Sequence, residues 1–581
     1  MRTGLKNSIT LVVLLPAVMA LLSCPAPAPR ELPKTLLFSP ISPEYLRDSA
    51  AAWKATGFDG FLLAGIMRNW SDDIWAMDND SASRDKGDST LIRIKSCNEA
   101  CREHGIEDNF IKVAFYSHVP FWLDDEKWQQ MNRNFHQAAR FAEMSGCRGI
   151  ALDIEYVSEQ YDLDWEGYDY SDHSESDLRE AAGKRGRDLV CSMLAAYPDM
   201  ILLTLPEGIN FYGPLAADLF FGMVEAMAQN RAPGGLGLLT ERSYDMTGIY
   251  GLVHYAFILE SQIVQQLDPA CTSYWQENCF IALGGWPLGY YRKIFDRDGT
   301  FLGYGGRREK FGDEIVGSYA DKSRRFSPSK FSEQYAGLLL GSRRYCWIYG
   351  HGATWWHFSP RDEAEYGAVG NSALPVDPQL EQFKSVVREK SIPQGTDSRF
   401  IQWSKLAPAQ RSADYFGFVR SFEVCGPFGC EDCDHFTTPF PPEKILESRG
   451  VAVLVGADSV LQWRRAIGDS STGYLDFIDY FSPKDWVCAY ALCRVTSPAA
   501  LDAQIRLGSN DSAVLWFNGE RILERNIERT AAMDSDILPV RLDEGENTVL
   551  IKVCNTERDW GLYLRFSDNE GAPLEGVEYW P

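Results

Sequence analysis

Short apolar runs alternate with longer amphipathic stretches between residues 35 and 395. Each run has the length of a buried strand, and the stretches between runs, such as 126–144 and 177–197, carry apolar residues at helical spacing. Eight strands separated by helices over about 350 residues are typical of a (β/α)8 TIM barrel with insertions. The runs that predict these strands are 35–39, 60–66, 111–117, 149–155, 201–206, 237–244, 280–284 and 345–349.

A doubly wound open sheet is the alternative fold for such an alternation. That fold usually carries a glycine-rich phosphate-binding loop after its first strand. Here the first predicted strand continues into Ser39-Pro40-Ile41-Ser42-Pro43, which contains no glycine. The sequence therefore favours a closed barrel over residues 35–395.

After residue 395 the pattern changes to short strands separated by turn signals. The runs 500–506, 513–517 and 548–553 predict strands, and Asn518-Gly519 and Glu544-Gly545 predict turns. Many short strands with such turns are typical of an antiparallel β-sandwich. We therefore expect a β-sandwich over residues 396–581.

Three segments of this second region resemble a jelly-roll module that accompanies polysaccharide-degrading domains in exported bacterial proteins. They are Cys425-Gly426-Pro427-Phe428, Pro441-Pro442-Glu443 and Trp516-Phe517-Asn518-Gly519. The resemblance covers roughly residues 415–575 and implies either carbohydrate binding or a structural role between domains. It points to no individual sugar-binding residue.

The first 24 residues have the pattern of a bacterial lipoprotein signal peptide. Arg2 and Lys6 precede an apolar stretch at 9–22, which has the length of a signal-peptide core and is too short to span a bilayer comfortably. It ends in Leu21-Leu22-Ser23-Cys24, which resembles the lipobox in which the cysteine is lipidated and becomes the mature N-terminus. We expect an exported protein, lipid-anchored at the outer membrane or cell surface. A secreted protein without lipid is the alternative.

Cleavage before Cys24 gives a signal peptide at 1–23 and a proline-rich tether at 24–34. An exported chain reaches a compartment where disulfides persist. The chain has 14 cysteines, so an odd number follows Cys24 and at least one of those lacks an intramolecular partner. The cluster Cys425, Cys430 and Cys433 lacks the second pair of a zinc motif. We therefore expect no metal and no cofactor.

Composition and charge narrow the classes of partner. The chain is 45% hydrophobic and 24% charged, which is a globular composition, and its net charge is −24. Because binding to a nucleic-acid backbone needs a basic surface, we expect no nucleic-acid partner. Aromatic residues make up 13% of the chain, with 17 Trp and 26 Tyr, which suits sugar binding as well as core packing.

The residues at the end of the fourth predicted strand are the main candidates for catalysis, because a barrel reacts with its substrate at the C-terminal ends of its strands. Asp153 and Glu155 are two residues apart, so on a strand both side chains would point the same way. Their mutual repulsion favours a retained proton near neutral pH. We expect Glu155 to act as general acid and Asp153 to orient the substrate. A structural ion pair with an arginine is the alternative.

This strand end resembles that of glycoside hydrolase family 18, the chitinase-like enzymes, which carries DxxDxDxE followed by Tyr. Asp153, Glu155 and Tyr156 match this motif, whereas Arg148 and Ala151 replace its first two aspartates. The resemblance implies a glycoside hydrolase whose substrate has a 2-acetamido group that attacks its own anomeric carbon.

Two further segments resemble the same family. The sequence Ser243-Tyr244-Asp245 is similar to the family's Tyr-Asp element on the sixth strand, so Tyr244 and Asp245 would hold the reacting sugar. The sequence Gly352-Ala353-Thr354-Trp355-Trp356 is similar to the segment after the eighth strand, where the family places a Trp under that sugar.

Because only the second half of the family 18 motif is present, two alternatives stay open. In other families of barrel glycosidases, one carboxylate comes from the fourth strand and the other from the sixth, and Glu241 or Asp245 could supply the second one. A non-catalytic, glycan-binding lipoprotein is the alternative of a different class.

Other polar and aromatic residues follow the predicted strands. For the tryptophans the alternative is core packing, and for the histidine it is a structural hydrogen bond. The expected substrate contacts are His118, Tyr156, Glu207, Trp286, Trp355 and Trp356.

The segment 292–330 reverses the charge of the chain, with ten basic residues against six acidic ones. It follows the seventh predicted strand, so it should overhang the active-site face, and its glycines predict a loop. Arg307 and Arg308 could bind a sulfated or uronic glycan, because guanidinium groups match sulfate and carboxylate geometry. Pairing with the protein's own acidic surface is the alternative.

Overall fold

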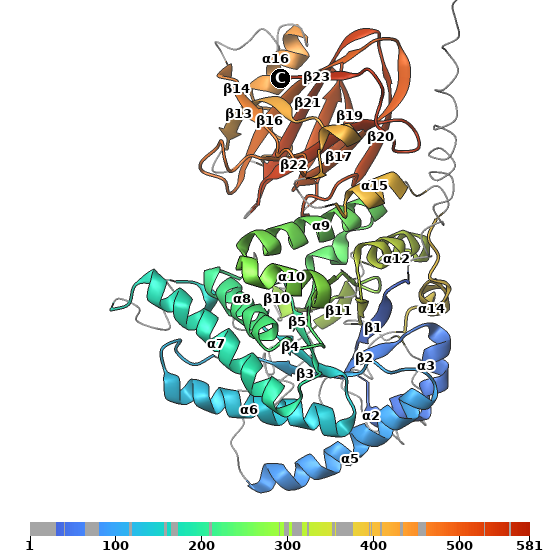
Figure 1. Cartoon of the computed structure of the whole chain (residues 1–581). Helices are drawn as coiled ribbons and strands as arrows, with labels where there is room; N and C mark the ends of the chain where they lie inside the picture. Colours follow the sequence, from blue (N-terminus) through green and yellow to red (C-terminus); the bar gives the residue numbers. More distant parts are fainter. Residues whose placement is uncertain are drawn as a thin grey trace, which may run out of the picture.

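A computed structural model gives the fold (Figure 1). Side chains are not described for residues 81–88, 245, 291–295, 301–304, 317–321 and 449. The described residues are 31–39, 41–63, 81–115, 119–155, 160–163, 172–207, 209, 212–289, 291–295, 301–304, 317–321, 325–350, 355, 376–393, 396, 398–406, 410–429, 434–450, 461–527, 529–556 and 559–581.

Within the described residues, eight parallel strands close into a barrel, which confirms the predicted fold. β1 pairs with both β2 and β12, while β7 pairs with β6 and the adjoining β8 pairs with β12, so the sheet has no free edge. β7 and β8 together form the bent seventh strand. The strands are β1 (Lys34–Phe38), β2 (Gly60–Leu63), β3 (Phe110–Ala114), β4 (Gly149–Asp153), β5 (Ile201–Leu205), β6 (Leu236–Leu239), β7 (Phe280–Ala282) with β8 (Gly284–Gly285), and β12 (Tyr345–Tyr349).

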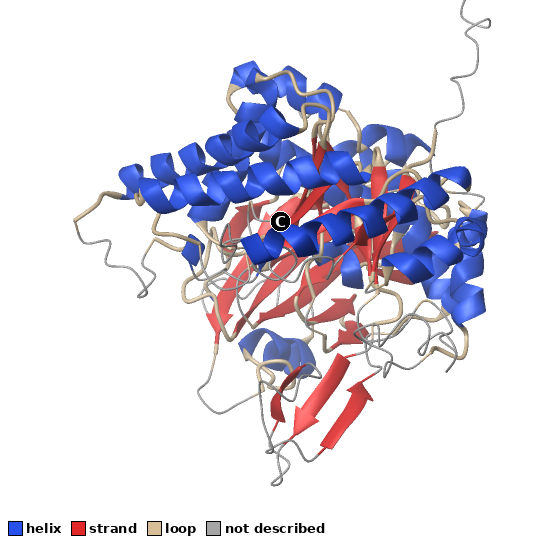
Figure 2. Ribbon diagram, turned by 90° about the horizontal axis from the view of Figure 1, so that it is seen from below, coloured by secondary structure: helices blue, strands red, loops and turns tan. Residues whose placement is uncertain are grey.

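Helices surround these strands on the outside (Figure 2). α6 begins after the cap Asp124, and α7 begins with a capping box between Ser174 and Asp177. Both helices match their predicted ranges. The helices are α2 (Pro43–Asp48), α3 (Ala50–Thr56), α5 (Ser81–Glu103), α6 (Asp125–Ser145), α7 (Glu175–Ala196), α8 (Pro214–Gln229), α9 (Ile249–Gln266), α10 (Pro269–Asn278), α12 (Pro328–Gly341), α14 (Leu380–Glu389) and α15 (Ser398–Trp403). In the described part of the chain, no helix has the length and apolarity needed to cross a membrane.

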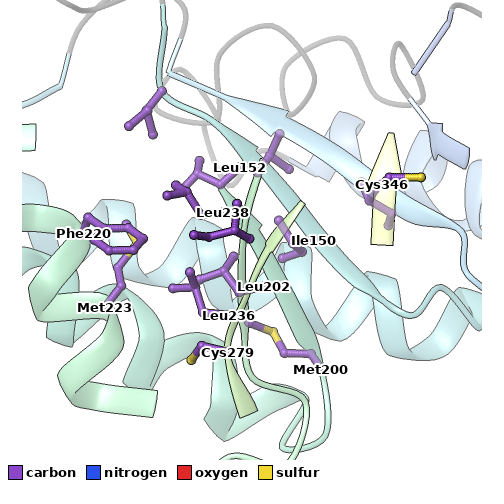
Figure 3. Close-up of a cluster of buried hydrophobic side chains, with 14 of the residues drawn as sticks. Ile150, Leu152, Met200, Leu202, Phe220, Met223, Leu236, Leu238, Cys279 and Cys346 are labelled. Atoms are coloured by element: carbon purple, nitrogen blue, oxygen red, sulfur yellow. The ribbon is translucent and has the colours of Figure 1, made fainter. Parts of the chain in front are cut away.

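The barrel strands bury both faces, and the two faces contribute to different cores. Ile150 and Leu152 of β4 pack against the helices together with Leu202 and Leu238 (Figure 3). Ala151 instead packs inside the barrel. Because side chains alternate along a strand, the residue that ends β4 also points inward.

The two predicted strands that carry the candidate carboxyl groups are too long at their C-terminal ends. β4 stops at Asp153, so the expectation that Asp153 and Glu155 share one face of a strand is wrong. An oxygen of the Asp153 carboxylate accepts the Glu155 N–H at 3.1 Å, which turns the chain away from the sheet. β6 stops at Leu239, and Arg242–Asp245 forms the 3-10 helix η3.

The basic segment contains strands in its described residues, so the prediction of a loop is wrong for those. β9 (Tyr291–Phe295), β10 (Phe301–Tyr304) and β11 (Gly317–Asp321) form an antiparallel sheet in the order β10-β9-β11. Arg325 pairs with Asp377 at 2.8 Å. This cation therefore follows the alternative, pairing within the protein.

Two antiparallel sheets form the C-terminal part, which confirms the predicted β-sandwich. One sheet has the order β14-β13-β16-β21-β18-β19 with β23 beside β16, and the other has the order β15-β22-β17-β20. Asn518 and Gly519, both with positive φ, connect β18 to β19 as predicted. The elements are β13 (Ser421–Phe428), α16 (Pro441–Arg449), β14 (Arg464–Ile467), β15 (Tyr474–Asp476), β16 (Val487–Ser497), β17 (Leu501–Asn510), β18 (Ala513–Phe517), β19 (Glu520–Arg525), β20 (Asp536–Leu542), β21 (Gly545–Asn555), β22 (Gly561–Ser567) and β23 (Glu578–Trp580).

α9 and α15 lie between the barrel and the sandwich (Figure 1). The guanidinium of Arg411 lies 3.7 Å from the ring centroids of both Phe257 and Trp403. The His254 ring stacks on Trp403 and meets Tyr563 edge-on at 5.0 Å. Burial, and then the Arg411 charge, lowers the pKa of His254 well below its usual value. Aromatic rings that pack around the Arg411 guanidinium and the His254 imidazole thus join the barrel to the sandwich.

The contact between α7 and α8 generates a prediction about stability. A methyl group at Gly222 would lie 2.0 Å from the Gly183 carbonyl oxygen, so Gly222→Ala should lower the free energy of unfolding by about 2 kcal/mol. Gly183→Ala is the matched control, because its added methyl group makes only ordinary contacts, with the Arg187 side chain at 3.5 Å and the Asp218 carbonyl oxygen at 3.6 Å. This control should leave stability unchanged or raise it by up to about 1 kcal/mol. Urea denaturation followed by circular dichroism measures both.

Candidate active site

The C-terminal end of β4 carries a buried ion pair. Asp153 is buried, and its carboxylate lies 3.0 Å from the ammonium of Lys112 on the neighbouring strand β3. Both side chains come from the inward-facing positions of their strands, where Phe110 and Ala151 line the barrel interior. Asp153 therefore forms a buried ion pair, as in the alternative interpretation, but its partner is a lysine and not the expected arginine.

Glu155 follows β4 in the turn that Asp153 fixes, and its side chain is only partly buried. Burial raises the pKa of Glu155 to about 7, the Asp153 charge adds to the rise, and the Lys112 charge opposes it. A carboxyl group with this pKa holds a proton close to neutral pH while remaining accessible to a substrate. These are the properties that a general acid needs.

Glu241 follows β6 on the turn into η3, and its side chain is also partly buried. Burial raises the pKa of Glu241 well above its usual value, and the charges of Glu155, Asp153 and Glu207 raise it further. The neighbouring Tyr244 hydroxyl opposes this rise. Glu155 therefore lies close enough to Glu241 for its charge to raise the pKa of Glu241.

Glu207 follows β5 and holds this turn in place. Its buried carboxylate accepts the N–H groups of Glu241 and Arg242 at 2.6 and 2.9 Å, and the Tyr255 hydroxyl of α9 at 2.9 Å. Because Glu207 takes these two amides, they are not available to extend β6. The expectation that Glu207 contacts substrate is corrected, since its oxygens are used within the protein.

Charge compensation divides these four carboxyl groups into two pairs. The buried Asp153 has the Lys112 ammonium and the Glu155 N–H as partners, and the buried Glu207 has three hydrogen-bond donors. The partly exposed Glu155 and Glu241 are the pair whose pKa values are raised. Two such carboxyl groups hold one proton more readily than none. The site therefore presents two carboxyl groups with raised pKa values to whatever binds there.

Aromatic rings pack inside the barrel next to Glu241. Tyr244 stacks parallel to Tyr349 with centroids 5.6 Å apart, and Trp286 meets both rings edge-on or tilted. Tyr244 and Trp286 are buried, so both side chains pack in the core inside the barrel. The charges of Glu155 and Glu241 raise the pKa of the nearby Tyr212 further than burial alone.

Of the remaining predicted residues, Trp355 is the one whose side chain the structure describes, and it lies away from this group. Trp355 is fully buried and packs against Phe58, Phe331 and Phe383 in the helical layer, so the expectation that it stacks on a sugar is wrong. The backbone of Asp245 lies in η3. The predictions for Cys24, His118, Tyr156, Arg307, Arg308 and Trp356 lie outside the described residues.

The sequence reasoning missed Lys112, Tyr212 and Tyr255. Lys112 had a detectable signal, because a lysine inside the apolar run Phe110-Ile111-Lys112-Val113-Ala114 needs a buried partner. The two tyrosines carry no comparable signal in the sequence. Among the described side chains, no group of three or more His, Cys, Asp or Glu residues has the arrangement of a metal site.

No protein-family model matches the chain, and no curated protein matches it. Among solved structures, a GH5_18 protein from Bifidobacterium longum subsp. infantis aligns over 62% of this chain and 79% of its own, with 10% identity and a TM-score of 0.33. A chitinase from Bacteroides thetaiotaomicron aligns over 63% and 98%, with 13% identity and a TM-score of 0.32. A Bacteroidetes-affiliated GH5 cellulase aligns over 64% and 94%, with 10% identity and a TM-score of 0.32. Likenesses this low carry no argument about function, which rests on the residues of the site.

Proposed function

We propose that the chain is a glycoside hydrolase that uses Glu155 and Glu241 as its two carboxyl groups. The observation that carries this proposal is that two partly buried carboxyl groups with raised pKa values follow the C-terminal ends of β4 and β6, with the charge of Glu155 adding to the rise at Glu241. Cleavage of a glycosidic bond needs one carboxyl group that donates a proton and one that is charged. Two carboxyl groups that share a proton meet this need at neutral pH.

Glu155 is the general acid in this mechanism. Its pKa of about 7 is close to neutral pH, so it can protonate the leaving oxygen and take up a new proton afterwards. When Glu155 holds the proton, it no longer adds a charge that raises the pKa of Glu241. The ionised form of Glu241 is then favoured, and it stabilises or attacks the developing oxocarbenium carbon.

The pairing of Asp153 favours this two-glutamate mechanism over the substrate-assisted one. A substrate acetamido group would need Asp153 as its partner, but Lys112 and the Glu155 N–H already hold that carboxylate. A 2-fluoro sugar that forms a covalent adduct on Glu241 would support the two-glutamate mechanism. Competitive inhibition by a thiazoline would support the substrate-assisted mechanism, with an N-acetylated substrate. An anionic substrate bound by Arg307 and Arg308 stays a prediction.

Replacing either glutamate tests the proposal. Glu155→Gln and Glu241→Gln should each lower kcat/KM for glycan hydrolysis by about 100-fold or more, because each removes proton transfer or charge stabilisation. Product release from an oligosaccharide library by wild-type protein identifies the substrate, and initial rates then compare the variants. Glu180→Gln, on the exposed surface of α7, is the control and should keep wild-type activity.

Two results would count against hydrolysis. Wild-type protein that binds glycans without releasing any product supports the non-catalytic alternative. Equal activity of wild type and both glutamine variants on a cleaved substrate would remove Glu155 and Glu241 from the mechanism.

The raised pKa of Glu155 also predicts a pH-dependent stability. The unfolded chain releases this proton near pH 4.5 and the folded chain only near pH 7, so wild type loses stability as pH rises between these values. Glu155→Gln removes that loss and should raise the free energy of unfolding by about 1–3 kcal/mol at pH 8 relative to its effect at pH 4. Urea titrations at both pH values measure the difference. A difference of zero would show that Glu155 has an ordinary pKa.

We further propose that Cys24 carries a lipid that anchors the chain at the cell envelope. β1 begins at Lys34, so the tether enters at the end of the barrel opposite to the carboxyl ends of the strands. An anchored chain would therefore hold Glu155 and Glu241 on its far side from the membrane.

Cys24→Ala should move the chain from the membrane fraction to the soluble fraction and abolish metabolic labelling with a fatty acid. Cys191→Ala, at an exposed cysteine, should leave both unchanged. Persistence of the label in Cys24→Ala would refute the anchor.

A further inference from the structure

The sandwich contains a cavity of about 720 Å³ that is separate from the barrel site. Its lining includes Trp486 and Asn555 at the paired ends of β16 and β21, together with Asp434, Asp485 and Asn526. These side chains combine one large aromatic surface with amide and carboxylate groups. A small number of polar groups around an aromatic ring is typical of a ligand site.

Trp486 presents its ring to solvent. The side chain is 60% exposed, an unusual position for a tryptophan. The backbone N–H of Trp486 donates to the Thr556 carbonyl at 3.0 Å, so this hydrogen bond fixes the backbone that carries the ring. Its φ of 55° lies in the left-handed region, which a bulky residue rarely adopts. The fold therefore holds an apolar surface at the cavity at an energetic cost.

Asn555 supplies a buried acceptor at the same cavity. Its side chain is 3% exposed, and its amide nitrogen donates to the Lys484 carbonyl at 2.8 Å. Among the residues that the structure describes, its amide oxygen has no hydrogen-bond donor. Since a buried polar atom without a partner is costly, this oxygen is suited to accept a hydrogen bond from a bound hydroxyl group.

The charge of the cavity selects the kind of ligand. Asp434 and Asp485 are exposed carboxylates at the lining, and Asp511 is a third, buried one. The oxygens of Asp434 and Asp511 already accept N–H and hydroxyl groups of the protein, which leaves Asp485 to accept a hydrogen bond from a ligand hydroxyl group. The charges of all three carboxylates repel sulfate or uronate groups. A ligand with many hydroxyl groups, an apolar face and no negative charge fits all of these features.

We propose that this cavity is a binding site for a neutral glycan, with Trp486 stacking on a sugar ring and Asn555 accepting a hydroxyl hydrogen. The proposal concerns binding alone and holds whether or not the barrel hydrolyses glycans. It gives the sandwich a recognition role beyond its contacts with the barrel.

Affinity electrophoresis of the full chain tests the proposal. The gels contain a mixed-linkage β-glucan, a xylan or a galactomannan as neutral probes, and an alginate or a sulfated galactan as anionic probes. Every chain in the gels, including the parent, also carries Glu155→Gln, which prevents hydrolysis of the probe. At least one neutral probe should retard the chain, and Trp486→Ala should raise the apparent Kd at least about tenfold, the size expected on loss of an aromatic anchor.

Two variants make the result specific. Trp486→Tyr keeps an aromatic ring and should stay within about threefold of the parent Kd. Trp580→Ala removes another exposed tryptophan of the sandwich, on β23, and should have no effect. Unchanged thermal unfolding of Trp486→Ala shows that the fold is intact. Equal retardation of the parent and Trp486→Ala, retardation by anionic probes only, or no retardation by any probe would each overturn the proposal.

Discussion

Repulsion between carboxyl groups at the end of the barrel is the constraint on which the rest of the site depends. Asp153, Glu155, Glu207 and Glu241 all influence the same small volume. Four uncompensated charges there would be costly in a partly dry environment. The protein compensates the two buried groups, Asp153 and Glu207, and leaves Glu155 and Glu241 with raised pKa values.

The hydrogen bonds that compensate the Glu207 charge connect the site to distant parts of the chain. The same carboxylate binds the turn after β6 and the Tyr255 hydroxyl of α9. Arg242, the residue after Glu241, pairs with Asp559 of the sandwich at 2.8 Å. The turn that carries Glu241 is therefore held from both the barrel and the sandwich, so the position of the second domain contributes to the geometry of the first.

The contact between the domains is built to keep that position. Arg411 lies between Phe257 and Trp403, and its side-chain nitrogens have no hydrogen-bond partner among the described residues. Burial lowers the pKa of Arg411 to about 9. The aromatic rings provide the attraction that offsets its desolvation. A cation held in this way is sensitive to displacement, because its partners face it from two sides.

The sequence by itself determined the elements and the approximate location of the site. Strand runs and helical spacing are local patterns, and closure of eight strands places Asp153, Glu155 and Glu241 at one end of the barrel. Only the tertiary structure decided where the strands stop and which carboxyl groups stay uncompensated. Lys112 reaches Asp153 from 41 positions away and Glu207 reaches the amide of Glu241 from 34, and no local pattern encodes such distances. Trp355 became a core residue for the same reason, because its neighbours in space are remote in sequence.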